Sequence, residues 1–227
     1  MLVSVIVPVL ADTPALERLS AQIPPDPRLE LIVVDGAADA RLDDLARTRG
    51  DLRALRSLPG RAIQMNAGAR AARGRWLLFL HADSTMPDGW LEAWERSSGR
   101  VIGGWFQFAL DHRAWQARVI EWGVRWRVRL LRLPYGDQGL FVRRDVFEAM
   151  GGFREMPLME DVDFVRRLGT RTGDLVELPL VLATSARRWE RDGWWRRSLR
   201  NVILVTLYFA GVSPSRLARW YGADTAD

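Results

Sequence analysis

The stretch that decides the fold is Arg75-Trp76-Leu77-Leu78-Phe79-Leu80-His81-Ala82-Asp83-Ser84. Its five consecutive large apolar residues follow a Gly-Arg turn and end at polar residues, which is typical of a strand buried on both faces. Ligands of open α/β sheets bind beyond the carboxyl ends of the strands. His81 and Asp83 are therefore placed to reach one bound ion or phosphate. The alternative interpretation is that Asp83 caps a helix starting near Pro87.

The segments around this strand predict an α/β fold. Buried strands are expected at 2–9 and 29–34, a short strand at 52–58, and helices at 15–21, 42–49, 60–73 and 88–97. This alternation of strands and helices favours a parallel, Rossmann-like sheet. Asp35 and Asp83 each follow a strand, so we expect both at the same edge of that sheet.

The second half of the chain has a different character. We expect strands at 101–110 and 140–142, short strands broken at Pro179 over 175–183, helices at 145–150 (capped by Asp145) and 160–168, and a helical tail from 194. A helical stripe is formed by Trp115, Val119, Trp122, Trp126, Leu130 and Leu133, and most nearby arginines fall off it. The stripe predicts either a core helix with a solvated opposite face or an interfacial helix on an anionic membrane.

Composition limits the classes of function. With 227 residues the chain forms one α/β domain, or one domain with an appendage, and can bury a large core. The absence of cysteine excludes disulfides and thiolate chemistry and fits a reducing compartment. All 33 basic residues are arginine, which suits phosphate recognition. They are scattered over many elements, so we expect no nucleic-acid partner.

No secretory signal or membrane span is expected. The first residues already form a core strand, and the longest apolar run, 202–212, is shorter than the roughly 20 residues that span a bilayer. The sequence therefore predicts a cytoplasmic protein. Peripheral contact with the inner face of the membrane is the alternative, because tryptophan and arginine recur together at 194–197 and 216–220. The tail could equally pack on the domain or form a homodimer contact.

Four motifs in order resemble family 2 glycosyltransferases of the GT-A fold: Val5-Ile6-Val7-Pro8, Val33-Val34-Asp35-Gly36, Phe79-Leu80-His81-Ala82-Asp83 and Glu160-Asp161. The segment 60–69 is similar to the helix that precedes the metal motif of this family. The likeness is greatest to a small bacterial branch with His-Ala-Asp in place of D-x-D. The resemblance implies a GT-A domain over 1–193, with a nucleotide-binding half (1–99) and an acceptor and catalytic half (100–193), followed by an amphipathic helical tail (194–227).

The resemblance also implies a donor site for a nucleotide-diphospho-sugar, with UDP as the expected nucleotide. Asp35 would hydrogen-bond the base near Pro8 and Val9. Arg61 would lie beside the base and the diphosphate, and Arg188 would stabilise the departing diphosphate.

A divalent metal, Mn²⁺ or Mg²⁺, is implied at the His-Ala-Asp motif. Asp83 is similar to the last acid of D-x-D, which holds an ion that bridges the two phosphates. His81 stands where the family usually has the first acid, and an imidazole suits Mn²⁺ better than Mg²⁺. His81 could instead contact the ribose or a phosphate, or simply pack.

Asp161 resembles the catalytic base of the family's E-D motif. A carboxylate facing the anomeric carbon, opposite the diphosphate, would take a proton from an acceptor hydroxyl, and displacement from that face inverts the anomeric configuration. The alternative is that Glu160, Asp161 and Asp163 only complement a helix N-terminus.

Acceptor contacts are expected on the same side. Arg188-Trp189 resembles the R-W half of a motif of processive members, but Ser185 replaces its glutamine, which argues against a processive synthase. The residues assigned to the acceptor side are Trp105, Asp137, Gln138, Glu160 and Trp189; for Trp105, Asp137 and Gln138, core packing or loop capping is the alternative. The acceptor itself is unidentified, and a lipid-linked one would follow from membrane contact.

Two other functions fit parts of the sequence. A nucleotidyltransferase would share the sheet, but it usually carries a Gly-rich basic loop after the first strand, where this chain has Val7-Pro8-Val9-Leu10-Ala11-Asp12. A non-catalytic nucleotide-sugar or glycan-binding protein is suggested by His81 in the metal motif. The acids Asp83 and Asp161 argue against that second alternative.

Overall fold

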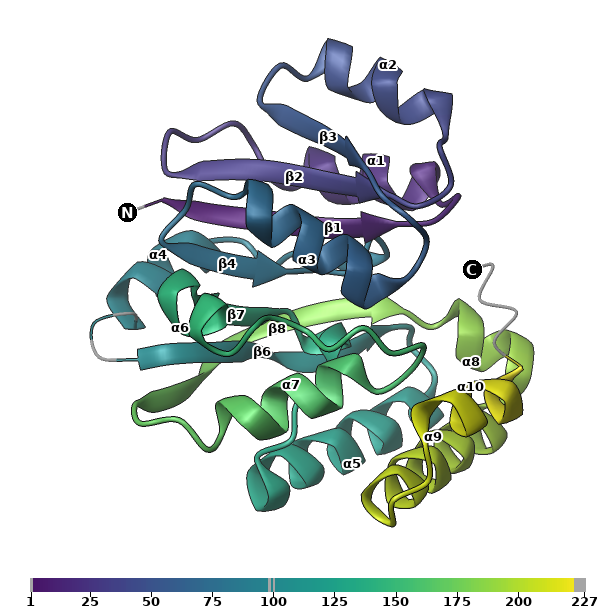
Figure 1. The fold of residues 1–227 in the computed structure, drawn as a ribbon. Helices are drawn as coiled ribbons and strands as arrows, with labels where there is room; N and C mark the ends of the chain where they lie inside the picture. The colour runs from purple at the N-terminus through teal and green to yellow at the C-terminus, as the bar shows by residue number, and fades with distance from the viewer. Residues whose placement is uncertain (1, 98, 100, 223–227) are drawn as a thin grey trace.

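The computed structural model describes residues 2–97, 99 and 101–222 as helices packed on one mixed sheet (Figure 1). The strands are β1 (Val3–Val9), β2 (Leu29–Asp35), β3 (Leu52–Arg56), β4 (Trp76–Phe79), β5 (Ser84–Thr85), β6 (Val101–Asp111), β7 (Leu140–Arg143) and β8 (Asp174–Ser185). The helices are α1 (Thr13–Ala21), α2 (Ala40–Thr48), α3 (Arg61–Ala71), α4 (Trp90–Ser97), α5 (Trp115–Leu131), the 3-10 turn η1 (Gly136–Gln138), α6 (Arg144–Ala149), α7 (Glu160–Leu168), α8 (Arg187–Asp192), α9 (Trp194–Phe209) and α10 (Pro214–Tyr221).

Within the described residues the strand order is β3-β2-β1-β4-β7-β6-β8-β5. Strands β1 to β4 pair in parallel, as the alternating sequence pattern predicts. Strand β7 runs antiparallel to both β4 and β6, and β8 pairs in parallel with β6. The carboxyl ends of β1, β2 and β4 therefore share one edge, where His81 and Asp83 follow β4.

The central strands are buried on both faces, which their unbroken apolar runs require. In β4, Leu78 belongs to the core that also contains α1 and α4, whereas Leu77 and Phe79 belong to the core that contains α3, α6 and α7. The rings of Trp76 and Trp94 meet edge to face with centroids 4.7 Å apart and anchor α4 against the sheet. The predicted double burial of this strand is confirmed.

Two expectations for the second half need correction, and one helix there is not predicted by the sequence. Strand β8 is continuous rather than broken at Pro179, because a bulge shifts its register against β6 there. Asp145 is not the cap residue of α6: it lies in the first turn, where its carboxylate pairs with Arg143. The helix α8, just before the tail, escaped prediction because its six residues are too few to show an apolar period.

The tryptophan stripe of α5 does not face the core. Trp115 is 64% exposed and Trp122 is 61% exposed, whereas Ala117, Glu121 and Val128 form the buried face of this helix. The core-helix interpretation is therefore wrong for the stripe residues within α5, and the buried Leu133 lies beyond the end of that helix. No helix within the described ranges is long and apolar enough to cross a membrane.

A buried carboxylate at the opposite edge of the sheet makes a stability prediction possible. Glu30 is 6% exposed and accepts hydrogen bonds from the Ser4 hydroxyl and from the backbone N–H groups of Arg73 and Gly74. Burial alone would raise the pKa of Glu30, but these bonds outweigh it and hold the pKa below its usual value. Glu30→Gln should lower the free energy of unfolding by about 1–3 kcal/mol at pH 7.

The pH dependence of that loss follows from the sign of the shift. A lowered pKa stabilises the fold above the ordinary pKa of glutamate, about 4.3, and this stabilisation disappears as pH falls through the folded-state pKa. Urea unfolding of the wild type and Glu30→Gln should therefore converge in acid. Glu17→Gln, at an exposed site on α1, should stay within about 0.5 kcal/mol of the wild type. If the difference in unfolding free energy between wild type and Glu30→Gln does not change with pH, Glu30 does not stabilise the fold through its ionised carboxylate.

Candidate active site

Two adjoining cavities lie beyond the carboxyl ends of the strands. The larger has a volume of about 750 Å³ and the smaller about 130 Å³. The side chains that line both are Arg61, His81, Asp83, Leu158, Arg188, Arg197 and Tyr221. These residues come from both halves of the chain and from the helical tail. We call these shared residues the seam, and arginine and aspartate make up most of it.

The larger cavity is built on the ends of β1 and β2. Pro8 and Val9 line it, and the buried Gln64 amide donates to the carbonyls of Val9 and Val34, which holds the two strand ends together. Asp35 is 1% exposed, and its carboxylate accepts backbone N–H bonds from Ala37 and Asp39 in the loop after β2. Asp35 thus shapes the loop beside the cavity, while Pro8 and Val9 face the space itself.

Arg61 and Glu160 form an ion pair across the site. Arg61 begins α3 and Glu160 begins α7, and their Nε and Oε1 atoms are 2.7 Å apart. Glu160 is 2% exposed, and its second carboxylate oxygen has no hydrogen-bond partner. Burial raises the pKa of Glu160, and the Arg61 guanidinium opposes that rise. Glu160 lines the larger cavity rather than the smaller, where it holds Arg61.

His81 and Asp83 lie together at the seam, as the sequence predicts. Burial, and next the positive charge of Arg61, lower the pKa of His81 to about 4. The imidazole is therefore neutral near pH 7, with one ring nitrogen free to accept a hydrogen bond or bind a cation. The Asp83 carboxylate lines both cavities and faces the same space.

Asp137 and Asp161 define the smaller cavity. The Gly136 N–H donates to Oδ2 of Asp161 over 2.8 Å, which fixes the carboxylate against the turn η1. A Cβ at Gly136 would lie 3.1 Å from Nε2 of His81 and 3.2 Å from Oδ2 of Asp161, so any other residue at 136 would push these two side chains away from the turn. Asp137 carries an unpartnered buried Oδ1 atom, and burial raises its pKa to about 6, which the Arg127 charge opposes and the Asp161 charge reinforces.

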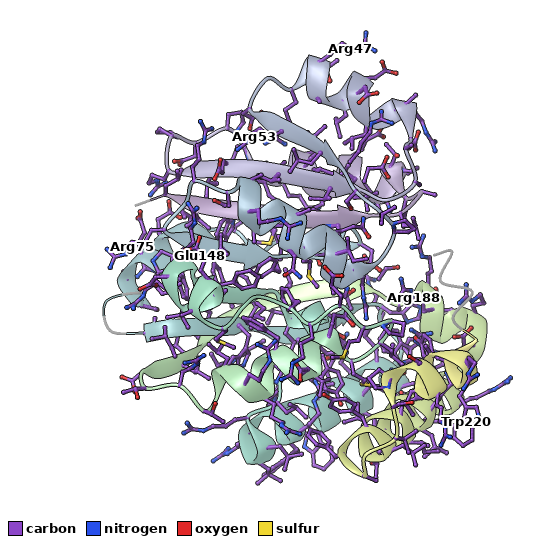
Figure 2. All side chains as sticks on the ribbon, in the orientation of Figure 1. Arg47, Arg53, Arg75, Glu148, Arg188 and Trp220 are labelled. Carbon is purple, nitrogen blue, oxygen red and sulfur yellow. The ribbon has the colours of Figure 1, made fainter. Side chains whose placement is uncertain are left out.

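The helix α8 brings Arg188 to the seam, and Figure 2 shows this residue between the end of the sheet and the tail helices. Arg187 pairs with Asp12 at 2.6 Å, and Arg197 pairs with Asp192 at 2.7 Å. Arg188, by contrast, has no ion pair within the part of the chain that the structure describes. Its half-buried guanidinium is thus available to an anionic ligand.

The remaining predicted acceptor residues are mainly structural in position. Trp105 is 5% exposed in the sheet, and its Nε1 atom donates to Glu177 over 3.3 Å. The Gln138 amide is buried, donates to the Phe106 carbonyl and lines neither cavity. Trp189 lines the smaller cavity while its Nε1 atom donates to Ser198 on α9.

Several lining residues escaped the sequence analysis. Four residues of the tail line the smaller cavity: Arg197, Asn201, Leu204 and Tyr221. The tryptophans and arginines of the tail indicate membrane contact in the sequence and give no sign of this role. The spacing of 197, 201 and 204 nevertheless places these three on one face of α9, which was the available signal. The Arg197 guanidinium also donates to the Tyr221 hydroxyl over 3.0 Å and so joins α9 to α10.

Comparisons with known proteins place the chain in a family. The sequence model described as "Glycosyl transferase family 2" matches residues 4–150, more than half of the chain. The chain resembles the mannosyltransferase PcManGT from Pyrobaculum calidifontis, solved with GDP-Man and Mn²⁺, at 20% identity and a TM-score of 0.64, covering 89% of this chain and 61% of that one. It resembles S. aureus TarS 1-349 at 16% identity and a TM-score of 0.63, covering 90% and 65%.

The same TarS region, solved with UDP-GlcNAc, gives a TM-score of 0.61 at 16% identity over 82% of this chain and 58% of that one. The chain thus spans less than two thirds of the length of these solved structures. A search of curated proteins gives no significant match. The family match carries the assignment, and the structural likeness agrees with it in fold. The chain belongs to glycosyl transferase family 2 and has the GT-A fold.

Proposed function

We propose that this protein is an inverting, metal-dependent glycosyltransferase that moves a sugar from a nucleotide-diphospho-sugar, UDP-linked by expectation, to an acceptor hydroxyl. The observation that carries the proposal is the division of the site into two cavities that meet at Arg61, His81, Asp83 and Arg188. The larger cavity fits a nucleotide, the charged seam fits a diphosphate, and the smaller cavity holds a carboxylate facing the seam.

In the proposed reaction, Asp161 takes the proton of the acceptor hydroxyl while the hydroxyl oxygen forms a bond to the anomeric carbon of the donor sugar. The bond from that carbon to the diphosphate breaks on the opposite face, and the nucleoside diphosphate leaves. The Gly136 N–H aims the Asp161 carboxylate, and Arg188 offers its guanidinium to the departing charge. Glu160 fixes Arg61 beside the same charge.

The residues at the seam fit a divalent cation that is shared with the donor. Within the described ranges, no three acidic or histidine side chains are grouped to hold an ion alone. Mg²⁺ and Mn²⁺ at such sites use one or two protein ligands and complete their coordination with substrate phosphates and water. Asp83 and neutral His81 would supply the protein ligands, and the unpartnered Oδ1 of Asp137 lies on the neighbouring cavity wall. When bound, the ion would neutralise phosphate charge.

We propose that residues 1–193 form the catalytic domain and that the tail from residue 194 closes one wall of its site. The inner face of α9 supports this arrangement, because Asn201, Leu204 and Val205 line the smaller cavity. Deleting the tail would therefore open the acceptor side of the site.

The function is tested by a screen of UDP-sugars and GDP-sugars with Mn²⁺ or Mg²⁺, in which released nucleoside diphosphate is measured. Turnover of at least one donor in the presence of metal is the expected result. Tight binding of a donor by calorimetry without any turnover would point instead to a binding protein. Release of pyrophosphate from a nucleoside triphosphate and a sugar phosphate would identify a nucleotidyltransferase.

Asp83→Asn should weaken metal-assisted donor binding. Removing one anionic ligand should cost about 1–3 kcal/mol, the scale of a hydrogen bond to a charged group. Calorimetry of wild type and variant, with and without Mn²⁺, measures this coupling. Asp88→Asn, in the loop that follows the motif, is the matched control. Equal donor affinity in all four combinations would reduce Asp83 to a structural role.

A further inference from the structure

Large apolar side chains lie exposed in a row along α5. Besides Trp115 and Trp122, the row contains Val119, Trp126 and Leu130, all of which are exposed. The opposite face of the helix is the one that packs on β6 and α8. Monomeric proteins rarely expose contiguous apolar patches of this kind without a binding partner.

The helix α9 extends the patch. Its exposed apolar residues are Trp195, Leu199, Val202, Ile203 and Phe209. The rings of Trp115 and Trp195, far apart in sequence, have centroids 5.7 Å apart, so the rows on α5 and α9 are continuous. Figure 1 shows α5, α9 and α10 along the same side of the molecule, away from α2 and β3. We call the exposed residues of these three helices the Trp-Arg face.

The charge of the Trp-Arg face has a single sign. Its exposed arginines are Arg118, Arg125, Arg129, Arg196, Arg216 and Arg219, with Arg132 just after α5. Across the described residues of α5, α9 and α10 the one acid is Glu121. Glu121 is 8% exposed, and its carboxylate accepts from the Leu110 N–H and pairs with Arg118. The face therefore presents guanidinium groups around tryptophans without exposed carboxylates.

We infer that the Trp-Arg face docks on an anionic lipid membrane. Tryptophan rings favour the headgroup region, and each arginine near an anionic surface adds roughly 1 kcal/mol of attraction. A second copy of the chain is a poorer occupant: a twofold contact of this face with itself would bring the arginine rows together with no acidic row to neutralise them. Charge complementarity thus selects a surface of lipid phosphates.

Docking in this orientation brings the membrane near the smaller cavity, where we propose that the acceptor binds. The helix α9 presents Leu199 and Val202 outward and lines the smaller cavity with Asn201 and Leu204. Only about the 10 Å diameter of one helix separates the two faces. This step rests on the proposed function: an acceptor hydroxyl carried by a membrane lipid would reach Asp161 across a short distance.

The test is co-sedimentation of the full chain with phosphatidylcholine vesicles, with and without phosphatidylglycerol. Binding only to the anionic vesicles is expected, and it should fall as salt shortens the Debye length from about 10 Å at 0.1 M to about 3 Å at 1 M. Arg125→Glu with Arg129→Glu should reduce the partition coefficient about 30-fold or more, the effect of losing two arginines at the surface. Brominated lipids should quench tryptophan fluorescence in the wild type and less in Trp122→Ser with Trp126→Ser.

The matched control is Arg47→Glu with Arg70→Glu, the same charge change on α2 and α3; Figure 2 shows Arg47 at the far end of the molecule from Trp220. The net charge of this control changes by the same amount, but its substitutions lie off the Trp-Arg face. It should therefore bind vesicles within about threefold of wild type. No binding of the wild type to anionic vesicles at low salt would overturn the inference. The inference would also be overturned if the wild type forms a dimer without binding vesicles, and if Trp122→Ser with Trp126→Ser abolishes that dimer. Release of nucleoside diphosphate from soluble donor is measured in parallel, so a failure of docking is distinguishable from a failure of the proposed reaction.

Discussion

Asp161→Asn is expected to lower the rate of sugar transfer to the acceptor by about 10²–10⁴-fold, which is the usual contribution of general-base catalysis. The substitution keeps the shape of the side chain and its hydrogen bond from Gly136 but removes the proton acceptor. Because a base acts in the transition state, donor and metal affinity should remain within a few-fold of wild type. Single-turnover transfer and donor calorimetry measure the two quantities separately.

The neighbouring acids provide the controls for this prediction. Asp163 is buried and bonds Arg154, Arg167 and the Tyr208 hydroxyl, so Asp163→Asn should reduce stability but keep the turnover of folded molecules. Glu160→Gln weakens the ion pair with Arg61 and should act mainly on donor affinity. If Asp161→Asn retains near-normal turnover, or if Glu160→Gln has the larger effect on transfer, the base has been assigned to the wrong residue.

The part of the site predictable from sequence is the part that strand ends fix. His81 and Asp83 follow a strand with an unbroken apolar run, so their place at the sheet edge needs only the rule that parallel strands end together. Pro8 and Val9 follow from the same rule. The contacts Gly136–Asp161 and Arg61–Glu160 could not be predicted in this way. They join elements distant in sequence, whose approach depends on packing of the whole second half.

The error on α5 has a definite physical cause. A stripe of apolar residues at helical spacing shows that a helix has two different faces, but not which face meets the protein. In α5 the buried face is made by small or paired residues, Ala117 and Glu121, which carry little hydrophobic signal, and the tryptophans point outward. The same limit hid Arg197 and Asn201, polar residues on the inner face of α9.

Arg188→Gln is the other substitution with a large expected effect, a loss of about 10²–10³-fold in turnover, which is the scale for one electrostatic donor that faces charge developing in the transition state. The arginines near it are already committed: Arg61 to Glu160, Arg187 to Asp12 and Arg197 to Asp192. Arg188 lines both cavities and, among the described residues, pairs with no carboxylate. Its charge is thus free to balance the departing diphosphate.

The conservative variant and a control make the assignment of Arg188 testable. Arg188→Lys keeps the charge but loses the planar fork, so it should recover part of the lost turnover. Arg166→Gln, at an exposed position on α7, should leave turnover unchanged. A role confined to the leaving group requires kcat to fall more than donor affinity. A fall in donor affinity with kcat unchanged would mean that Arg188 binds the donor equally in the ground state and in the transition state. Intact turnover in Arg188→Gln would mean that Arg61 stabilises the departing diphosphate instead. The Arg61 guanidinium lines the same seam but also pairs with Glu160.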